Sequence, residues 1–118
     1  MKYFSEDELK CSHCGSQGMK EDFMVKVEQL REELGFPFPV TSAYRCNNHP
    51  IEAKKDLPGA HASGRAIDIA VSRTEAYLLV EAALRAGFTG IGINQKGSSR
   101  FIHLDDLTTG VRPTIWSY

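Results

Sequence analysis

The sequence lacks several features that would assign a protein to a large functional class. No run approaches the roughly 20 apolar residues of a membrane span, and the first ten residues, MKYFSEDELK, contain no apolar core of a secretory signal. An excess of one charge is also absent, because 14 basic residues oppose 15 acidic ones, for a formal net charge of -1. We therefore expect a protein that binds neither nucleic acid nor an anionic membrane and that is cytoplasmic as synthesised.

Cysteine is scarce and odd in number, since the chain has only Cys11, Cys14 and Cys46. An odd count argues against a fully paired disulfide framework and favours reduced thiols or metal ligands. Together with His49, the cysteines form C-x-x-C followed later by C-x-x-H, a set of ligands typical of a closed, structural zinc site. His13 is an alternative to His49, and three free thiols are the other interpretation.

Three helices are predicted. Ser5 and Glu8 have the spacing of a capping box, which indicates a short helical turn directly after Ser5. Apolar residues at helical spacing predict a second helix over 20–34. The capping-box pattern recurs in SRTE at 72–75 and predicts a third helix over 73–86.

Short runs rich in strand-forming residues and bounded by turns predict a sheet. A polar loop is expected over 47–59, and the predicted strands are 40–44, 65–71, 89–94, 100–105 and 113–118. The third and fourth runs flank a Gly/Ser turn and therefore predict an antiparallel hairpin. We expect one domain over residues 1–118 of class α+β, with N-terminal helices packed on a small antiparallel sheet.

One group of residues has the chemistry of a catalytic metal site. GAHASGRAIDIAV sets His61 and Asp68 seven positions apart, and RFIHLDD supplies His103. A catalytic zinc usually has three protein ligands, and two histidines with a carboxylate are suitable donors. Ala66 and Ala70 would share a strand face with Asp68 and leave room for an ion. Spacing alone favours an interpretation without a metal. In it, His61 is a surface histidine, Asp68 a strand-edge carboxylate and His103 a hydrogen-bonded core histidine.

HASGRAID followed by FIHLD resembles the zinc-binding signature of the zinc D-alanyl-D-alanine carboxypeptidase family, which also contains phage peptidoglycan endopeptidases. That signature is roughly S-x-H-x-x-G-x-A-x-D with a later histidine, and Gly59 stands where it has serine. KYFSEDELKC, TSAYRC and RPTIWSY resemble the start, the S-G-Y-R segment and the tail of its small single-domain members. The resemblance covers nearly the whole chain. It implies the hedgehog/DD-peptidase fold and a zinc ion held by His61, Asp68 and His103.

The resemblance also suggests catalytic residues, with one departure. Many family members place an acid three residues before the second histidine, but here that position is Arg100, which cannot act as a base. Asp105 shares a strand face with His103 and is our candidate general base, and orienting that histidine is an equally weighted alternative. Asp106 would point to the opposite face as a solvated charge or turn residue. Arg45 matches the arginine of S-G-Y-R, which in those enzymes binds the substrate or its developing oxyanion.

Together the residues and the resemblance predict a monomeric zinc peptidase that hydrolyses peptidoglycan stem peptides, as a D-Ala-D-Ala carboxypeptidase or an endopeptidase. We expect an endolysin-type protein that acts on the cell wall after phage-type release. The alternative is a zinc-containing module of the same fold that binds a wall peptide with little or no cleavage, which the missing acid at Arg100 favours. A zinc-ribbon protein centred on the cysteines would explain neither HASGRAID nor FIHLD.

Overall fold

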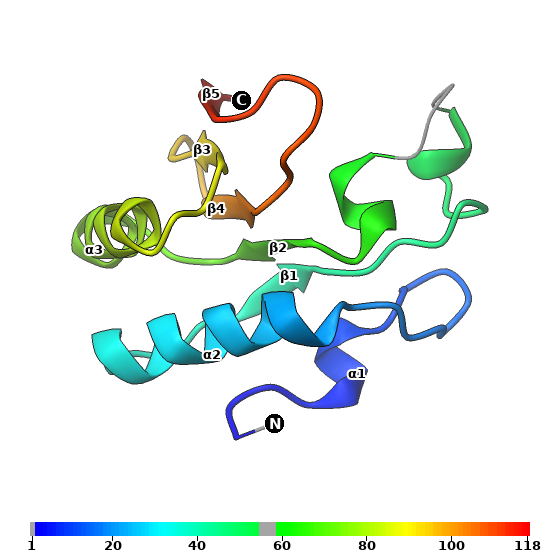
Figure 1. Ribbon diagram of the computed structural model, residues 1–118, viewed down its shortest axis with the longest axis horizontal. Coiled ribbons are helices and arrows are strands. Elements are labelled where there is room, and N and C mark those ends of the chain that lie inside the picture. The colour runs from blue at the N-terminus through cyan, green and yellow to red at the C-terminus, as the bar shows by residue number, and fades with distance from the viewer. Residues whose placement is uncertain (1, 55–58) are drawn as a thin grey trace.

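The structure, a computed structural model, describes residues 2–54 and 59–118. In these residues the α+β class is confirmed (Figure 1). The helices are α1 (Glu6–Leu9), α2 (Glu21–Leu34) and α3 (Arg73–Arg85), with short 3-10 helices η1 (Glu52–Lys54) and η2 (Ala60–Ser63). The strands are β1 (Val40–Ser42), β2 (Ala66–Ile69), β3 (Gly90–Asn94), β4 (Phe101–Asp105) and β5 (Thr114–Ser117). The expected polar loop over 47–59 contains η1, and its positions 55–58 lie outside the described residues.

The five strands form one sheet in the order β1-β2-β4-β3-β5. The predicted hairpin of β3 and β4 is confirmed as antiparallel, and β1, β2 and β4 also pair antiparallel. The expectation of a purely antiparallel sheet is corrected at β5, which pairs parallel to β3. The reason is the chain path: β5 follows β4 but lies beyond β3, and both β3 and β5 run opposite to β4.

The helices begin for different local reasons. At α1 the predicted capping box is present, because the Glu8 amide donates to Ser5 Oγ at 3.2 Å and the Ser5 amide donates to Glu8 Oε1 at 3.0 Å. At α3 the predicted capping box is wrong, since the Ser72 side chain makes no capping hydrogen bond. Arg73 instead adopts a φ of 54° and its amide donates to Gln95 Oε1 at 3.3 Å. Within the described chain, no helix has the length and apolarity to cross a membrane.

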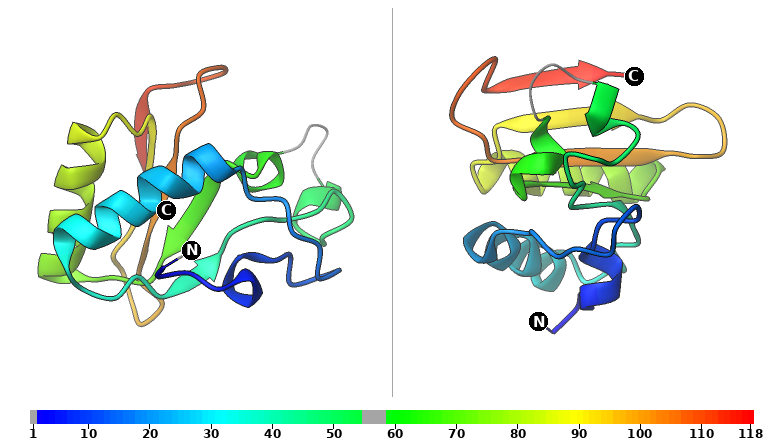
Figure 2. Two further views of the ribbon diagram at one scale, coloured as in Figure 1. Left: turned by 60° about the horizontal axis from the view of Figure 1, so that its bottom comes forward. Right: turned by 90° about the vertical axis from the view of Figure 1, so that its right-hand side faces the viewer.

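The two faces of the sheet differ in chemistry. Alternate residues of the central strands join the core that α2 and α3 cover, among them Ile67, Ile69, Ile102 and Leu104. Successive strand residues point to opposite faces, so the intervening polar residues of β2 and β4 point away from that core. Figures 1 and 2 show α3 on one side of the strands and the η2 segment on the other. The polar face of the sheet therefore lies under η2.

Candidate metal centre

His61, Asp68 and His103, which the sequence suggested as metal ligands, lie together in the structure. His61 comes from η2, while Asp68 of β2 and His103 of β4 face each other directly in the antiparallel register. All three side chains are buried, and one ligand atom of each lies within 4.8 Å of the other two. Folding thus joins Asp68 and His103, which are 35 positions apart, with His61 into a single group of potential metal ligands.

Hydrogen bonds fix where the protons of the two imidazoles lie. Nδ1 of His61 is 2.7 Å from the carbonyl oxygen of Ala43, and Nε2 of His103 is 2.7 Å from Oδ2 of Asp105. A carbonyl and an ionised carboxylate only accept hydrogen bonds, so these two ring nitrogens carry the protons. The remaining nitrogens, Nε2 of His61 and Nδ1 of His103, lie 3.2 Å and 3.0 Å from Oδ1 of Asp68.

If both imidazoles are neutral, Nε2 of His61, Nδ1 of His103 and Oδ1 of Asp68 all have lone pairs and no hydrogen. Such an arrangement requires a cation between them or a second proton on each imidazole. Burial raises the pKa of Asp68, but hydrogen bonds and charges from His103 and His61 lower it to about 2, so the carboxylate is ionised at neutral pH. Two neutral imidazoles and one carboxylate form a donor set that zinc accepts. The residues present therefore fit a zinc ion.

Asp105 lies behind His103 and not beside the three ligand atoms. Its carboxylate contacts Nε2 of His103, the ring nitrogen that faces away from Asp68, and receives hydrogen bonds from Nε and Nη2 of Arg112 at 2.9 Å and 2.8 Å. Gly90 on β3 leaves the space, because a Cβ there would stand 2.2 Å from Oδ1 of Asp105. Burial raises the pKa of Asp105, but His103 and Arg112 lower it to about 2. This geometry differs from the expectation that Asp105 faces the metal.

A cavity of about 310 Å³ opens over the three ligand residues. Among the described residues that line it, Asp68 is the only carboxylate. Sequence reasoning assigned no role to Trp116 or Tyr118 of the C-terminal tail, both of which line this cavity. The Trp116 ring centre is 5.0 Å from that of His103, and burial raises the pKa of Tyr118, which keeps the phenol protonated. The sequence feature that could have identified these two residues is the aromatic pattern of RPTIWSY at 112–118.

Arg45 is held on the wall of this cavity. Its amide donates to the carbonyl of His61 at 3.3 Å, and its Nη1 is 3.6 Å from Oε2 of Glu52. Glu52 is buried and also accepts a hydrogen bond from the amide of Gly59 at 2.8 Å. Arg45 is therefore no free surface arginine, and Glu52 is a supporting residue that the sequence did not reveal. Arg100 is absent from the cavity lining and donates to a turn carbonyl at 3.0 Å.

Asp106 corrects a sequence-based expectation, because it is buried and not solvated. Only 8% of the residue is exposed. Its carboxylate accepts hydrogen bonds from Nε and Nη2 of Arg65 at 2.8 Å and 2.9 Å and also pairs with Lys26 of α2. Arg65 contacts Asp22 as well, at 2.7 Å. These ion pairs connect the end of β4 to α2, on the opposite side of the strand from His103.

The three cysteines also come together. Their sulfur atoms lie within 4.8 Å of one another, with Cys11 buried and Cys14 exposed, and none of Cys11, Cys14 and Cys46 is in a disulfide. Burial raises the pKa of the Cys11 thiol, but backbone N–H groups of Cys46, Cys14 and His13 lower it to about 7. The expected fourth ligand, His49, is not in the group, since its ring nitrogens contact a serine hydroxyl at 3.2 Å and a backbone amide at 3.1 Å.

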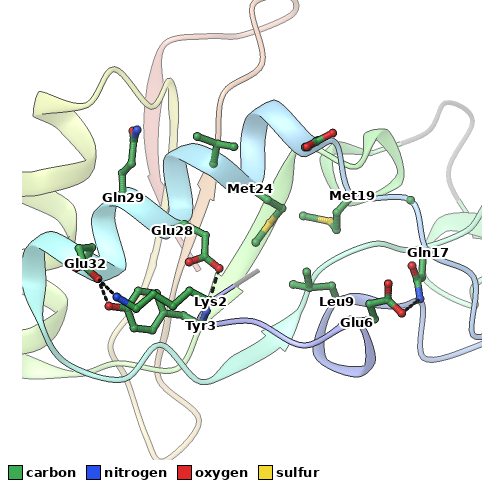
Figure 3. A pocket seen from close by; sticks show the side chains of 13 residues that line it. Lys2, Tyr3, Glu6, Leu9, Gln17, Met19, Met24, Glu28, Gln29 and Glu32 are labelled. Atoms are coloured by element: carbon green, nitrogen blue, oxygen red, sulfur yellow. Dashed lines mark hydrogen bonds and ion pairs between the residues drawn. The ribbon is translucent and has the colours of Figure 1, made fainter.

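A larger cavity in the described part of the chain lies elsewhere. It has a volume of about 820 Å³ between the N-terminal segment and α2 (Figure 3). Its polar groups pair with one another: the Tyr3 hydroxyl donates to Glu32, and Gln17 donates to Glu6 at 3.0 Å. None of the described residues that line it is a histidine or a cysteine. The smaller cavity over His61 is therefore the better candidate for a functional site, because it has potential metal ligands.

Comparison with known families agrees with this assignment. A family model described as Peptidase M15 matches residues 2–105. The chain belongs to the peptidase M15 family. This zinc-dependent family is of the zinc D-Ala-D-Ala carboxypeptidase type and acts on peptidoglycan peptides, and the α+β fold is consistent with its hedgehog/DD-peptidase-like fold. The match contains His61, Asp68 and His103, whereas β5 lies beyond it. A search of curated proteins found no significant match.

Proposed function

We propose that the protein is a zinc-dependent peptidase that hydrolyses peptide bonds in peptidoglycan stem peptides. One observation carries the proposal: Nε2 of His61, Nδ1 of His103 and Oδ1 of Asp68 converge beneath a cavity of about 310 Å³. Membership of the M15 family supports metallopeptidase chemistry. A zinc ion held by His61, Asp68 and His103 would acidify a water molecule and polarise the scissile carbonyl.

The protein's own groups prepare the ligands for that ion. Hydrogen bonds from His61 to the Ala43 carbonyl and from His103 to Asp105 fix the tautomer and the orientation of each ring. We therefore assign Asp105 the orienting role, in place of the general base. Arg112 supports this role because its two N–H groups hold the Asp105 carboxylate in position.

The cavity wall supplies groups that suit a peptide substrate. The guanidinium of Arg45, positioned by Glu52, offers charged N–H donors for a substrate carboxylate or for negative charge that develops on the carbonyl oxygen. Tyr118 provides a protonated phenol on the same wall. Trp116 and Phe101 add apolar surface against which aliphatic parts of a stem peptide can pack.

A wall-peptide binding module with little or no hydrolysis is the second candidate, and one observation favours it. Apart from Asp68, no carboxylate among the described residues lines the cavity, so the usual acceptor for the proton of the attacking water is missing there. Asp105 is engaged with His103 and Arg112. A protein of this kind would hold zinc and bind the stem peptide without cleaving it.

Digestion of defined muropeptides by the zinc-loaded protein separates the two candidates. We expect mass spectrometry to show either loss of the terminal D-alanine, which identifies a carboxypeptidase, or cleavage inside the stem or cross-link, which identifies an endopeptidase. His61→Ala is the matched inactive control. If the fully zinc-loaded protein binds muropeptides but leaves their masses unchanged, the peptidase proposal fails and the binding module stands.

A further inference from the structure

The segment after α1 is folded around the sulfur atom of Cys11. The Gly15 amide donates to the carbonyl oxygen of Cys11 at 2.8 Å, and Gly15 has a φ of 75°, a left-handed conformation that glycine adopts without strain. The backbone N–H groups of His13 and Cys14 in this turn lower the pKa of the Cys11 thiol. The amide of Cys46, from a distant segment, donates to the same sulfur at 3.3 Å. Several N–H donors around one sulfur stabilise a thiolate more than a thiol.

The three sulfur atoms have a spacing that suits a tetrahedral metal ion. Zinc binds thiolate sulfur at about 2.3 Å, which places tetrahedral ligand sulfurs about 3.8 Å apart. The sulfurs of Cys11, Cys14 and Cys46 all lie within 4.8 Å of one another, so only a small contraction is needed. Without a cation, three ionised thiolates this close would repel one another. The cluster therefore combines a preformed ligand spacing with an N–H group that faces the Cys11 sulfur, while burial and the neighbouring cysteines raise the pKa of the Cys46 thiol.

We propose that Cys11, Cys14 and Cys46 hold a second zinc ion, separate from the His61–Asp68–His103 group. Water would complete the fourth tetrahedral position, because neither His13 nor His49 belongs to the group of potential ligands. This site has no role in bond cleavage, and its existence does not depend on the proposed peptidase activity.

The zinc ion would connect two segments that are far apart in the sequence. Cys11 follows α1, whereas Cys46 follows Arg45 directly, and Arg45 lines the cavity over the first metal site. In the structure these segments are already joined by a hydrogen bond from the Tyr44 amide to the Leu9 carbonyl at 3.3 Å. A metal cross-link across 35 positions stabilises the fold by restricting the unfolded chain. It also fixes the backbone that positions Arg45.

Zinc content per chain tests the proposal, measured by mass spectrometry of metals after dialysis. We expect two zinc ions in the wild type, one in Cys14→Ser, and one in the His61→Ala/His103→Ala double variant, which lacks the first site. Cys14 is exposed, so its substitution is compatible with folding. Ser16→Ala is the matched control, because it removes the hydroxyl that accepts a hydrogen bond from Cys14 at 3.1 Å and leaves all three sulfur atoms, and it should retain two zinc ions.

Substitution of Co²⁺ for zinc distinguishes the two sites in the wild-type protein, so this test does not depend on whether a variant folds. In the Co²⁺-loaded wild type we expect the near-ultraviolet charge-transfer band that sulfur–cobalt bonds give and imidazole or carboxylate bonds do not. The band should persist in the double histidine variant and vanish in Cys14→Ser. A wild type that is fully loaded with Co²⁺ but lacks this band, or whose intact mass shows a disulfide in place of bound metal, overturns the proposal. Loss of peptidase activity alone would leave it standing.

Discussion

His103 is held from both sides of its ring, because Nε2 donates to Asp105 at 2.7 Å while Nδ1 lies 3.0 Å from Asp68. The hydrogen bond to Asp105 thus occupies one ring nitrogen, and in a neutral ring the other nitrogen turns its lone pair toward the ligand group. The strength of the metal site therefore depends on a residue that does not contact the metal position. Asp105 itself is held by two hydrogen bonds from Arg112.

Substitution of Asp105 by Asn should loosen zinc binding. An amide accepts a weaker hydrogen bond from His103 and loses the ion pair with Arg112, and lost orienting partners typically cost about 10–100-fold in metal affinity. Zinc affinity measured by competition with a chelator checks this. Asp106→Asn is the matched control, because the neighbouring carboxylate faces Arg65 and should leave zinc affinity unchanged. A general base would behave differently: the variant would keep its zinc and lose about 100–10,000-fold in rate.

Gly90→Ala should reproduce the effect of Asp105→Asn without changing any charged residue. The added Cβ would lie 2.2 Å from Oδ1 and 2.4 Å from Cγ of Asp105, so the carboxylate must move away from His103 and Arg112. We expect lower zinc affinity and a lower melting temperature. Thr89→Ala changes the adjacent position, where the hydroxyl donates only to the Leu107 carbonyl, and should leave zinc affinity intact. Wild-type zinc affinity in Gly90→Ala would mean that the position of Asp105 does not control the metal site.

The ion pairs of Asp106 should make the free energy of unfolding depend on pH in the acid range. Burial raises the pKa of Asp106, but Arg65 and Lys26 outweigh it and hold the pKa below its usual 3.8. The stabilisation is therefore present above pH 3.8 and is lost as the pH falls through the lower folded-state pKa. Asp106→Asn should unfold more easily at neutral pH, by about 1–3 kcal/mol, and show a flatter stability curve in acid.

Thermal melts of the wild type, Asp106→Asn and Asp22→Asn across the acid range measure this dependence. Asp22→Asn is the control, because Asp22 pairs with the same Arg65 but is exposed, and solvent screening reduces its contribution. The assignment to Asp106 would be refuted if Asp22→Asn flattened the acid dependence as much as Asp106→Asn does.

Sequence patterns predicted the features that depend on local physics. Alternating residues in RFIHLD identified which side chains share a face, and Gly90 and Gly92 in GIGIN lie beside Asp105 and His103 on that face. The capping box at Ser5 formed as expected because its partners are only three residues apart. The candidate zinc ligands became identifiable through resemblance, since a histidine and an aspartate seven positions apart specify no geometry by themselves.

Features that depend on distant segments were not predictable in the same way. Strand alternation placed Asp105 on the face of His103 but could not say which ring nitrogen it would contact, because the answer depends on Arg112 and on the space over Gly90. Asp106 was expected to be solvated, and its burial results from Arg65 and a lysine of α2, 41 and 80 positions away. The parallel pairing of β5 likewise follows from the path of the chain after β4.

Arg45→Ala should reduce hydrolysis while zinc content stays at the wild-type value, because Arg45 lines the cavity but supplies no metal ligand. If its guanidinium stabilises negative charge on the carbonyl oxygen, kcat should fall by about 100–1,000-fold. If it binds a ground-state carboxylate of the stem peptide, KM should rise with kcat nearly constant. Steady-state kinetics on one muropeptide separate these results. Arg100→Ala is the matched control, since Arg100 lies outside the cavity lining. Unchanged kcat and KM in zinc-loaded Arg45→Ala would exclude Arg45 from substrate binding and catalysis.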